Sequence, residues 1–322
     1  MSSVNSVLGP VDVENLGRVL MHEHVFTLNA ELRDEYPWDE DAVVASAVAE
    51  LSDLKAHGID TIVDLTVFGL GRNIRRIRRI AEQVDLQIIP ATGIYTYHDL
   101  PSFFALNEQR KPGFITDFLV REIEGGVDDT GIRPAILKVA VDHHGVTPDL
   151  DFLLRATARA HRRTGAPIKT HADAHSKQGL AQQRIFSEEG VDLSRVIIGH
   201  VGDAKDLSYA EELIAAGSTV GLDRLGAASI GANAITPDER VDVIIELVRR
   251  GYADRILLSH DTHVRSDSID RRLRESNTPD WRYTHIPDVV VPRLLEAGIS
   301  QEDIDQMLVK NPQRIFSETS SY

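Results

Sequence analysis

The sequence predicts a (β/α)8 barrel, in which eight parallel strands form a closed sheet inside a ring of helices. Eight short apolar segments recur along the 322 residues, and helical patterns separate most of them. Most segments are apolar on both faces, as strands of a parallel sheet covered by helices must be. Eight such strands close a barrel, which takes about 250 residues plus insertions. Residues 1–322 are therefore predicted to form one domain.

The individual elements follow from these segments in chain order. The expected strands are residues 19–26, 61–67, 87–94, 135–141, 167–172, 196–200, 218–222 and 255–259. The expected helices are residues 41–57, 73–84, 150–164, 177–189, 207–216 and 237–250. Four of these helices are followed by a glycine, as is typical of a helix C-terminus. Residues 287–316 are expected to add two further helices over the barrel.

An open, doubly wound sheet is the main alternative. Such a sheet usually has fewer strands and carries a phosphate-binding glycine fingerprint after its first strand. The candidate fingerprint here, Gly69-Leu70-Gly71, lacks the third glycine and follows a later strand. The barrel is therefore preferred.

Composition excludes several functions. With 50 acidic and 35 basic residues the formal net charge is -15, which argues against a nucleic-acid partner. The chain has no cysteine, so thiolate chemistry is excluded and any metal must use other ligands. The N-terminus lacks the pattern of a signal peptide, and no stretch approaches the ~20 apolar residues of a membrane span. A cytoplasmic location without membrane contact is expected.

His22 and His24 form the most informative motif. They end the first expected strand one residue apart, and residues i and i+2 of a strand point to the same side. Neutral imidazole is a common ligand of zinc-like metals, so the pair is half of a metal site. The alternative is two histidines that hydrogen-bond within the core. The ends of the later strands decide between the two.

Four of those later strand ends also carry residues that bind metals. Function in a barrel sits at the C-terminal ends of the strands. The fourth, fifth, sixth and eighth strands supply Lys138, His171, His200 and Asp261. Five strand ends with such residues favour a metal site over polar residues satisfied within the core.

Lys138 is the unusual member of this set. A free ammonium would be costly to bury in an apolar strand and could not bind a metal. A buried amine of lowered pKa can add carbon dioxide, and the resulting carbamate can bridge two cations about 3.5–4 Å apart. The alternative is a lysine paired with a nearby carboxylate such as Asp261.

The chain resembles the phosphotriesterase family of the amidohydrolase superfamily, and within it the phosphotriesterase-like lactonases. The shared pattern is HxH, then lysine, histidine, histidine and aspartate on strands four, five, six and eight. The matching stretches cover nearly the whole chain: GRVLMHEH at 17–24, ATGIY at 91–95, GLAQQRIF at 179–186, GHVGD at 199–203, GLDR at 221–224, LLSHD at 257–261 and NPQRIF at 311–316.

The resemblance implies a centre with two divalent metal ions. One metal would take His22, His24 and Asp261, the other His171 and His200, with carboxylated Lys138 and a hydroxide as bridges. Asp261 would also accept the proton of the attacking hydroxide. Zinc is the first choice, and cobalt, manganese and iron fit the same ligands.

The same resemblance implies a substrate pocket and a homodimer. Tyr97 and Arg224 are expected to bind substrate and assist catalysis, with ordinary polar rim residues as the alternative. Leu225, His263 and Trp281 are further candidates for substrate contact.

The leading expectation is a metal-dependent hydrolase of lactones, and N-acyl-homoserine lactones are the first-choice substrates. Opening these signals would be quorum quenching, and weak hydrolysis of organophosphate triesters is the expected side activity. Residues 262–274 are markedly charged where the lactonases have a more apolar loop. A true phosphotriesterase and a hydrolase of polar sugar lactones therefore stay open, as does a catalytically silent barrel that binds a metabolite.

Overall fold

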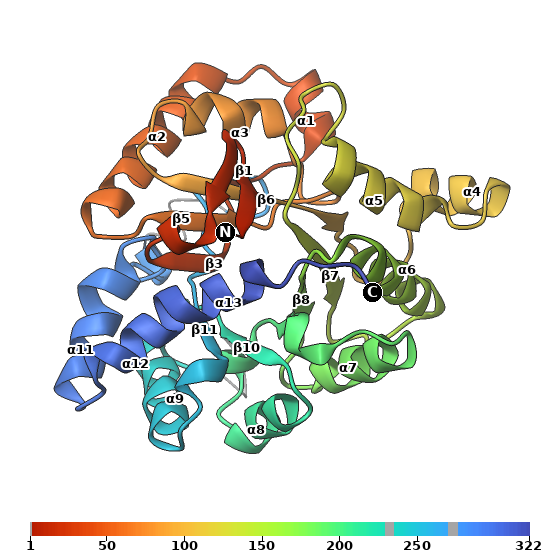
Figure 1. The fold of residues 1–322 in the computed structure, drawn as a ribbon. Helices are drawn as coiled ribbons and strands as arrows, with labels where there is room; N and C mark the ends of the chain where they lie inside the picture. The colour runs from red at the N-terminus through yellow and green to blue at the C-terminus, as the bar shows by residue number, and fades with distance from the viewer. Residues whose placement is uncertain (1, 229–234, 270–275) are drawn as a thin grey trace.

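The central sheet of this computed structural model confirms the predicted (β/α)8 barrel (Figure 1). Residues 2–228, 235–269 and 276–322 are described. Eight parallel strands follow one another around the sheet in chain order. They are β3 (Val19–Glu23), β5 (Thr61–Asp64), β6 (Gln87–Ile94), β7 (Ile136–Val141), β8 (Ile168–Ala172), β9 (Val196–Ile198), β10 (Thr219–Leu222) and β11 (Ile256–Leu258).

The ends of the first and last strands close the sheet. The amide of Asp261 donates to the carbonyl of His22 at 3.1 Å, and that of His24 donates to the carbonyl of Thr262 at 3.1 Å. The amide of His22 donates to Oγ of Ser259 at 2.8 Å. Two candidate metal-binding segments, far apart in sequence, are therefore joined by backbone hydrogen bonds.

The six predicted helices are all present around the strands. They are α2 (Glu40–Ala56), α3 (Ile74–Ala81), α6 (Pro148–Thr164), α7 (Gln178–Glu188), α8 (Leu207–Ala215) and α9 (Pro237–Arg249). The two helical segments expected at the C-terminal end are also present, each with a π-helical turn. One joins Ile286–Val290 to α11 (Val291–Glu296), and the other joins α12 (Gln301–Asp305) through Gln306–Lys310 to α13 (Asn311–Ser317).

The structure adds elements that periodicity did not predict. These are the hairpin of β1 (Ser3–Ser6) and β2 (Gly9–Asp12), and the helices α1 (Ala30–Glu35), α4 (Ser102–Arg110) and α5 (Phe114–Gly125). α1 buries none of its residues and α4 buries only Phe104. Short helices with so small a buried face carry almost no periodic signal.

The core consists of two apolar layers separated by the strands. Inward-facing residues such as Met21, Val63 and Ile136 fill the barrel, while the alternate positions pack against the helices. This two-sided burial is why the strands are apolar on both faces.

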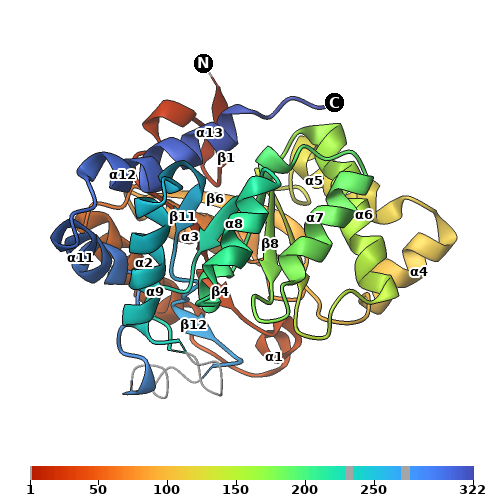
Figure 2. The same cartoon turned by 90° about the horizontal axis from the view of Figure 1, so that it is seen from below.

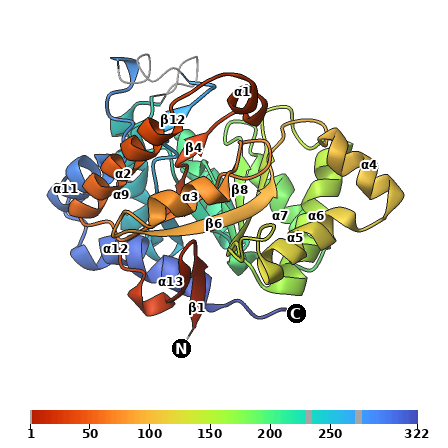
Figure 3. The ribbon, with the colours of Figure 1, turned by 90° about the horizontal axis from the view of Figure 1, so that it is seen from above.

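The two ends of the barrel differ in what they carry. Both termini lie at one end, and α1 and the short strands β4 (Phe26–Thr27) and β12 (Arg265–Ser266) lie at the other (Figures 2 and 3). The first expected strand, 19–26, is thus interrupted: β3 ends at Glu23, and β4 pairs with β12 in a separate parallel sheet. In the described part of the chain, none of the helices has the length and apolar character that a membrane span requires.

Candidate metal centre

A bulge in β3 sets the direction of His22. Leu20 pairs with Ile62, but Glu23 pairs with Asp64, so β3 contains one extra residue between these pairs. Leu20 packs outward, and strict alternation would place His22 on the same outer side. The extra residue reverses the alternation, as bulges do near active sites. His22 therefore faces the barrel interior, which strand periodicity alone does not explain.

His22, His200 and Asp261 form a compact cluster of potential metal ligands at the strand ends. One ligand atom from each lies within 4.8 Å of the others. Asp261 Oδ1 is 3.5 Å from Nε2 of His22 and 3.3 Å from Nε2 of His24, and Oδ2 is 3.8 Å from Nε2 of His200. The structure thus brings together four of the six residues expected to bind metal.

The remaining two, Lys138 and His171, lie beside this cluster. Nζ of Lys138 is 3.0 Å from Nε2 of His22, and Nδ1 of His171 is 2.8 Å from Nε2 of His200. Among the described residues no carboxylate forms an ion pair with Lys138, so the expected alternative of a pair with Asp261 is not seen. Lys169 forms such a pair instead, with Asp223.

Asp223 and Lys169 are residues that the sequence analysis missed. Oδ2 of Asp223 accepts from Nδ1 of His22 at 2.7 Å and from Nζ of Lys169 at 2.5 Å, and Oδ1 accepts from Nδ1 of His200 at 2.8 Å. All four side chains are buried. A Cβ on Gly221 would lie 2.2 Å from Nζ of Lys169 and 2.5 Å from Oδ2 of Asp223, so a side chain there would displace the buried ion pair. The available signal was an acidic residue directly after the seventh strand.

The two other histidines are oriented in the same way. Nδ1 of His24 donates to Oγ1 of Thr66 at 3.0 Å, and Nε2 of His171 donates to Oδ2 of Asp142 at 2.8 Å. Each ring therefore uses one nitrogen for the protein and turns the other toward the cluster. This is the usual arrangement of histidines that bind a metal.

Burial and neighbouring charges together favour the protonation states that a metal needs. Burial lowers the pKa of His171 to about 3, and His200 adds to the effect. Burial and the nearby Lys169 ammonium lower the pKa of Lys138 to about 7. Burial alone would raise the pKa of Asp261, but His22 and its other neighbours hold it well below the usual range. Neutral imidazoles, an ionised carboxylate and a free amine near neutral pH fit divalent cations.

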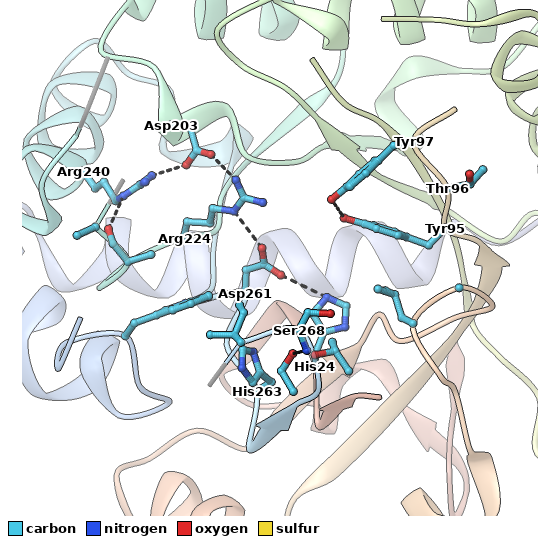
Figure 4. A pocket seen from close by; sticks show the side chains of 18 residues that line it. His24, Tyr95, Thr96, Tyr97, Asp203, Arg224, Arg240, Asp261, His263 and Ser268 are labelled. Carbon is cyan, nitrogen blue, oxygen red and sulfur yellow. Dashed lines mark hydrogen bonds and ion pairs between the residues drawn. The ribbon is translucent and has the colours of Figure 1, made fainter. Parts of the chain in front are cut away.

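A cavity of about 690 Å³ opens directly above the cluster and reaches His24 and Asp261 (Figure 4). On one side Nε of Arg224 donates to Oδ2 of Asp261 at 3.0 Å, and its Nη1 donates to Oδ2 of Asp203 at 2.6 Å. Arg240 binds the other oxygen of Asp203. Arg224 is thereby fixed between two carboxylates and does not point freely into solvent.

Tyr95 and Tyr97 form another side of the cavity. Their hydroxyls lie 2.5 Å apart and point toward each other (Figure 4), and the hydroxyl of Tyr95 is 3.1 Å from Nδ1 of His171. Tyr97 thus reaches the cluster through Tyr95 and through its own ring, which lies 5.4 Å from that of His171 between centroids. Tyr97 was expected from the sequence and Tyr95 was not, although both follow the third strand of the barrel.

The three other candidates for substrate contact differ in position. His263 and Trp281 line the cavity, with their rings edge to face at 5.6 Å between centroids. Leu225 does not line it and packs in the outer core, 1% exposed.

Within the charged segment 262–274, the described residues Arg265 and Asp267 do not line the cavity. Ser266, Ser268 and Ile269 do line it. Asp267 instead pairs with Arg33 at 3.2 Å. The pairing of β12 with β4 places Arg265 and Ser266 on opposite faces of this short strand. The charged residues at 270–274 lie outside the described part of the chain.

The barrel, the His/Asp cluster and the cavity define the class of metal-dependent hydrolases. A model of the phosphotriesterase family matches residues 2–316, and the chain belongs to this family of binuclear metal enzymes. The resemblance seen in the sequence is thus confirmed.

Individual relatives agree with this assignment. The solved structure of the phosphotriesterase from Mycobacterium tuberculosis has a TM-score of 0.94, with 48% identity over 99% of this chain and 100% of that one. An aryldialkylphosphatase of Saccharolobus solfataricus is 35% identical over 95% of this chain and 97% of its own length. A solved structure from the engineering of organophosphate hydrolysis activity from a weak promiscuous lactonase template has a TM-score of 0.89, with 33% identity over 98% of this chain and 100% of that one.

Proposed function

We propose that the protein hydrolyses the ring ester of lactones. N-acyl-homoserine lactones are the proposed preferred substrates, and organophosphate triesters are hydrolysed weakly. The observation that carries the proposal is the pairing of Arg224 with Asp261 opposite the hydroxyls of Tyr95 and Tyr97. Fixed donors at both sides of a reacting centre suit a flat ring whose carbonyl and leaving oxygens each need one hydrogen bond. The similarity to a structure derived from a lactonase template supports the proposal.

The proposed metal ligands are those that the family resemblance implies. His22, His24 and Asp261 would hold one cation, and His171 and His200 the other. Lys138, as its carbamate (N6-carboxylysine), would join the two. Two such cations would supply an activated water molecule near neutral pH and polarisation of the substrate carbonyl. Zinc is the proposed metal.

The residues of the chain supply binding and proton transfer. Asp261 accepts the proton of the attacking water, and Arg224 holds that carboxylate in place from the adjacent strand end. The tyrosine hydroxyls orient the lactone, and their donated hydrogen bond favours departure of the ring oxygen. Asp203 fixes Arg224 and so keeps its donors aligned.

The cavity lining favours an acyl lactone over a sugar lactone. Leu70, Ala227, Ile269 and Trp281 supply apolar surface beside the hydroxyls of Thr27, Ser266 and Ser268. The two charges of the described loop that argued for a polar substrate, Arg265 and Asp267, are absent from this lining. Quorum quenching, a cytoplasmic location, a homodimer and a single domain belong to the same proposal.

A kinetic comparison tests the proposal. The metal-loaded protein is assayed with an N-acyl-homoserine lactone, a sugar lactone and paraoxon, and kcat/KM is compared. The acyl lactone is expected to be the best substrate and paraoxon a weak one. A paraoxon value above both lactones would make the protein a true phosphotriesterase, and no turnover of any of the three by protein with full metal content would indicate a silent binding barrel.

A further inference from the structure

Glu23, the residue between the two histidines of the HxH motif, has a role that the metal ligands do not explain. Its side chain is fully buried, and it turns away from the metal cluster toward the end of β11. Oε1 accepts from the backbone amide of His260 and from Nδ1 of the same residue, each at 2.8 Å. Oε2 accepts from the amide of Thr262 at 3.2 Å. The carboxylate thus binds both residues that flank Asp261.

The ring of His260 is fixed as a donor to Glu23. The amide of Ile286 donates to Nε2 of His260 at 3.0 Å, so the ring proton lies on Nδ1 and points at Glu23. On the other side, Nε1 of Trp281 donates to the carbonyl of His260 at 2.7 Å. The peptide before Asp261 is therefore held at each of its polar atoms.

Asp261 itself has an unfavourable backbone conformation. Its φ is +53°, in the left-handed region that residues other than glycine adopt only occasionally. Such a conformation persists only where the surrounding structure enforces it. The hydrogen bonds to Glu23 act on the residues before and after Asp261. The amide of Asp261 adds a third fixed point through the carbonyl of His22.

We infer that Glu23 is a positioning residue that holds the 260–262 turn in the strained conformation aiming Asp261 at the metal ions. The HxH segment then has two roles in the metal centre. His22 and His24 contribute ligands, and Glu23 positions the ligand Asp261 from the distant end of β11. The inference rests on the proposed metal centre. It extends that centre by assigning a task to a residue that binds neither metal nor substrate.

A purely structural buried carboxylate would behave differently from a positioning residue. Loss of general packing or hydrogen bonding would lower thermal stability but leave metal retention and kcat of the folded protein intact. Loss of Asp261 positioning would weaken metal binding and lower kcat, with little effect on KM. Glu122 offers a matched control, because it is also a buried glutamate but binds Arg72 and Thr92 far from Asp261 in the sequence.

The test uses Glu23→Gln, Glu23→Ala and the control Glu122→Gln, each compared with the wild-type protein. Glutamine keeps the volume and one acceptor but presents an NH2 group to a donor. Metal retention is measured as the chelator concentration that removes half of the bound zinc. Kinetic constants are measured on protein that retains its zinc. Hydrogen exchange of the Thr262 amide is followed on metal-free protein.

For Glu23→Gln the half-release chelator concentration and kcat are each expected to fall about tenfold. KM should change less than threefold, and the Thr262 amide should exchange faster. Glu23→Ala should show the larger loss where it folds, and Glu122→Gln should match wild type in zinc retention and kcat. Wild-type values for Glu23→Gln, or equal losses in Glu122→Gln, would overturn the inference. Failure of the wild-type protein to hold zinc would overturn the proposed metal centre. In that case the hydrogen exchange of metal-free protein still tests Glu23, because an unchanged exchange rate of the Thr262 amide in Glu23→Gln would reject its positioning role.

Discussion

Lys138 and Lys169 occupy paired positions on neighbouring strands, yet their surroundings give them different chemistry. Lys169 is neutralised by Asp223, whereas Lys138 lies against His22 with no carboxylate partner among the described residues. Burial and the Lys169 ammonium lower the pKa of Lys138 to about 7, so its amine is available to carbon dioxide near neutral pH. The lowered pKa of Lys138, caused first by burial, supports the proposed carbamate at this position.

Replacement of Lys138 by alanine is expected to abolish activity and lower bound metal, and addition of a short carboxylic acid should restore part of both. The bridge supplies an anion, and a small acid can enter the space that the side chain leaves. Turnover and metal content are measured with and without the acid. Lys177→Ala, which removes an exposed lysine, serves as the control. Full activity of Lys138→Ala without the acid would remove the carbamate from the mechanism.

Arg224 and the two tyrosines are expected to separate lactone from phosphotriester hydrolysis. A lactone needs placed hydrogen bonds at its carbonyl and ring oxygens, whereas an aryl leaving group needs little protonation. Arg224→Ala and Tyr95→Phe should therefore reduce kcat/KM for the lactone more than for paraoxon, by about 1–3 kcal/mol. Tyr97→Phe should follow the same direction, because its hydroxyl lines the cavity beside that of Tyr95. Equal losses for both substrates would make these residues structural supports.

At the scale of elements, the pairing of β4 with β12 shapes one wall of the cavity. Asp267 fixes this wall, since Oδ2 accepts from the amide of Asn29 at 2.8 Å and pairs with Arg33. Asp267→Ala should loosen the segment that presents Ser266 and Ser268 to the substrate. KM for the lactone is expected to rise about three- to tenfold, with kcat nearly unchanged, because each lost polar contact is worth about 1 kcal/mol. Steady-state kinetics give both constants, and a fall in kcat alone would contradict this assignment.

The end of the chain is tied to α6 at the opposite end of the barrel. Nδ1 of His161 donates to the carbonyl of Ala166 at 2.7 Å, and Nε2 accepts from the hydroxyl of Tyr322 at 2.7 Å. That hydroxyl in turn accepts from the amide of Asp192 at 2.7 Å. Contacts at this end of a barrel are expected to serve stability, because catalytic residues lie at the C-terminal ends of the strands.

Burial lowers the pKa of His161 to about 4 from its ordinary value of 6.5. Between these values the unfolded chain binds more protons than the folded protein, so stability rises with pH and is lost as pH falls from 6.5 toward 4. The free energy of unfolding should drop between pH 7 and pH 5 by about 1–2 kcal/mol more in the wild type than in His161→Gln. Denaturant unfolding at the two pH values measures this difference, and identical drops would show that His161 does not titrate on unfolding.

For the molecule as a whole, periodicity predicted the barrel, and the residues at the strand ends supplied the candidate metal ligands. The eight apolar segments fix the strands, and strand ends of a barrel converge, so His22, Lys138 and His171 could be placed together from the sequence. The bulge in β3 could not be predicted, because it depends on the register with β5. Tyr95 was missed because its hydroxyl reaches His171 only through the tertiary fold.

Periodicity also could not predict the residues that hold the metal ligands in place. Asp223 and Glu23 each bind residues from other strands, and no spacing in the sequence reveals such partners. The position of the charged loop beside the cavity depends on a two-residue strand, β12, and its partner β4 lies far earlier in the chain. In each case a contact between distant segments, and not a local propensity, determines the role of the residue.

A crystal structure of the zinc-loaded protein tests the central claim most directly. Two metal peaks are expected about 3.5–4 Å apart, one beside His22, His24 and Asp261 and the other beside His171 and His200. Electron density for a planar carboxylate should extend beyond Nζ of Lys138 and reach both peaks. A bare Lys138 amine with one peak or none, in protein that hydrolyses a lactone, would contradict the account.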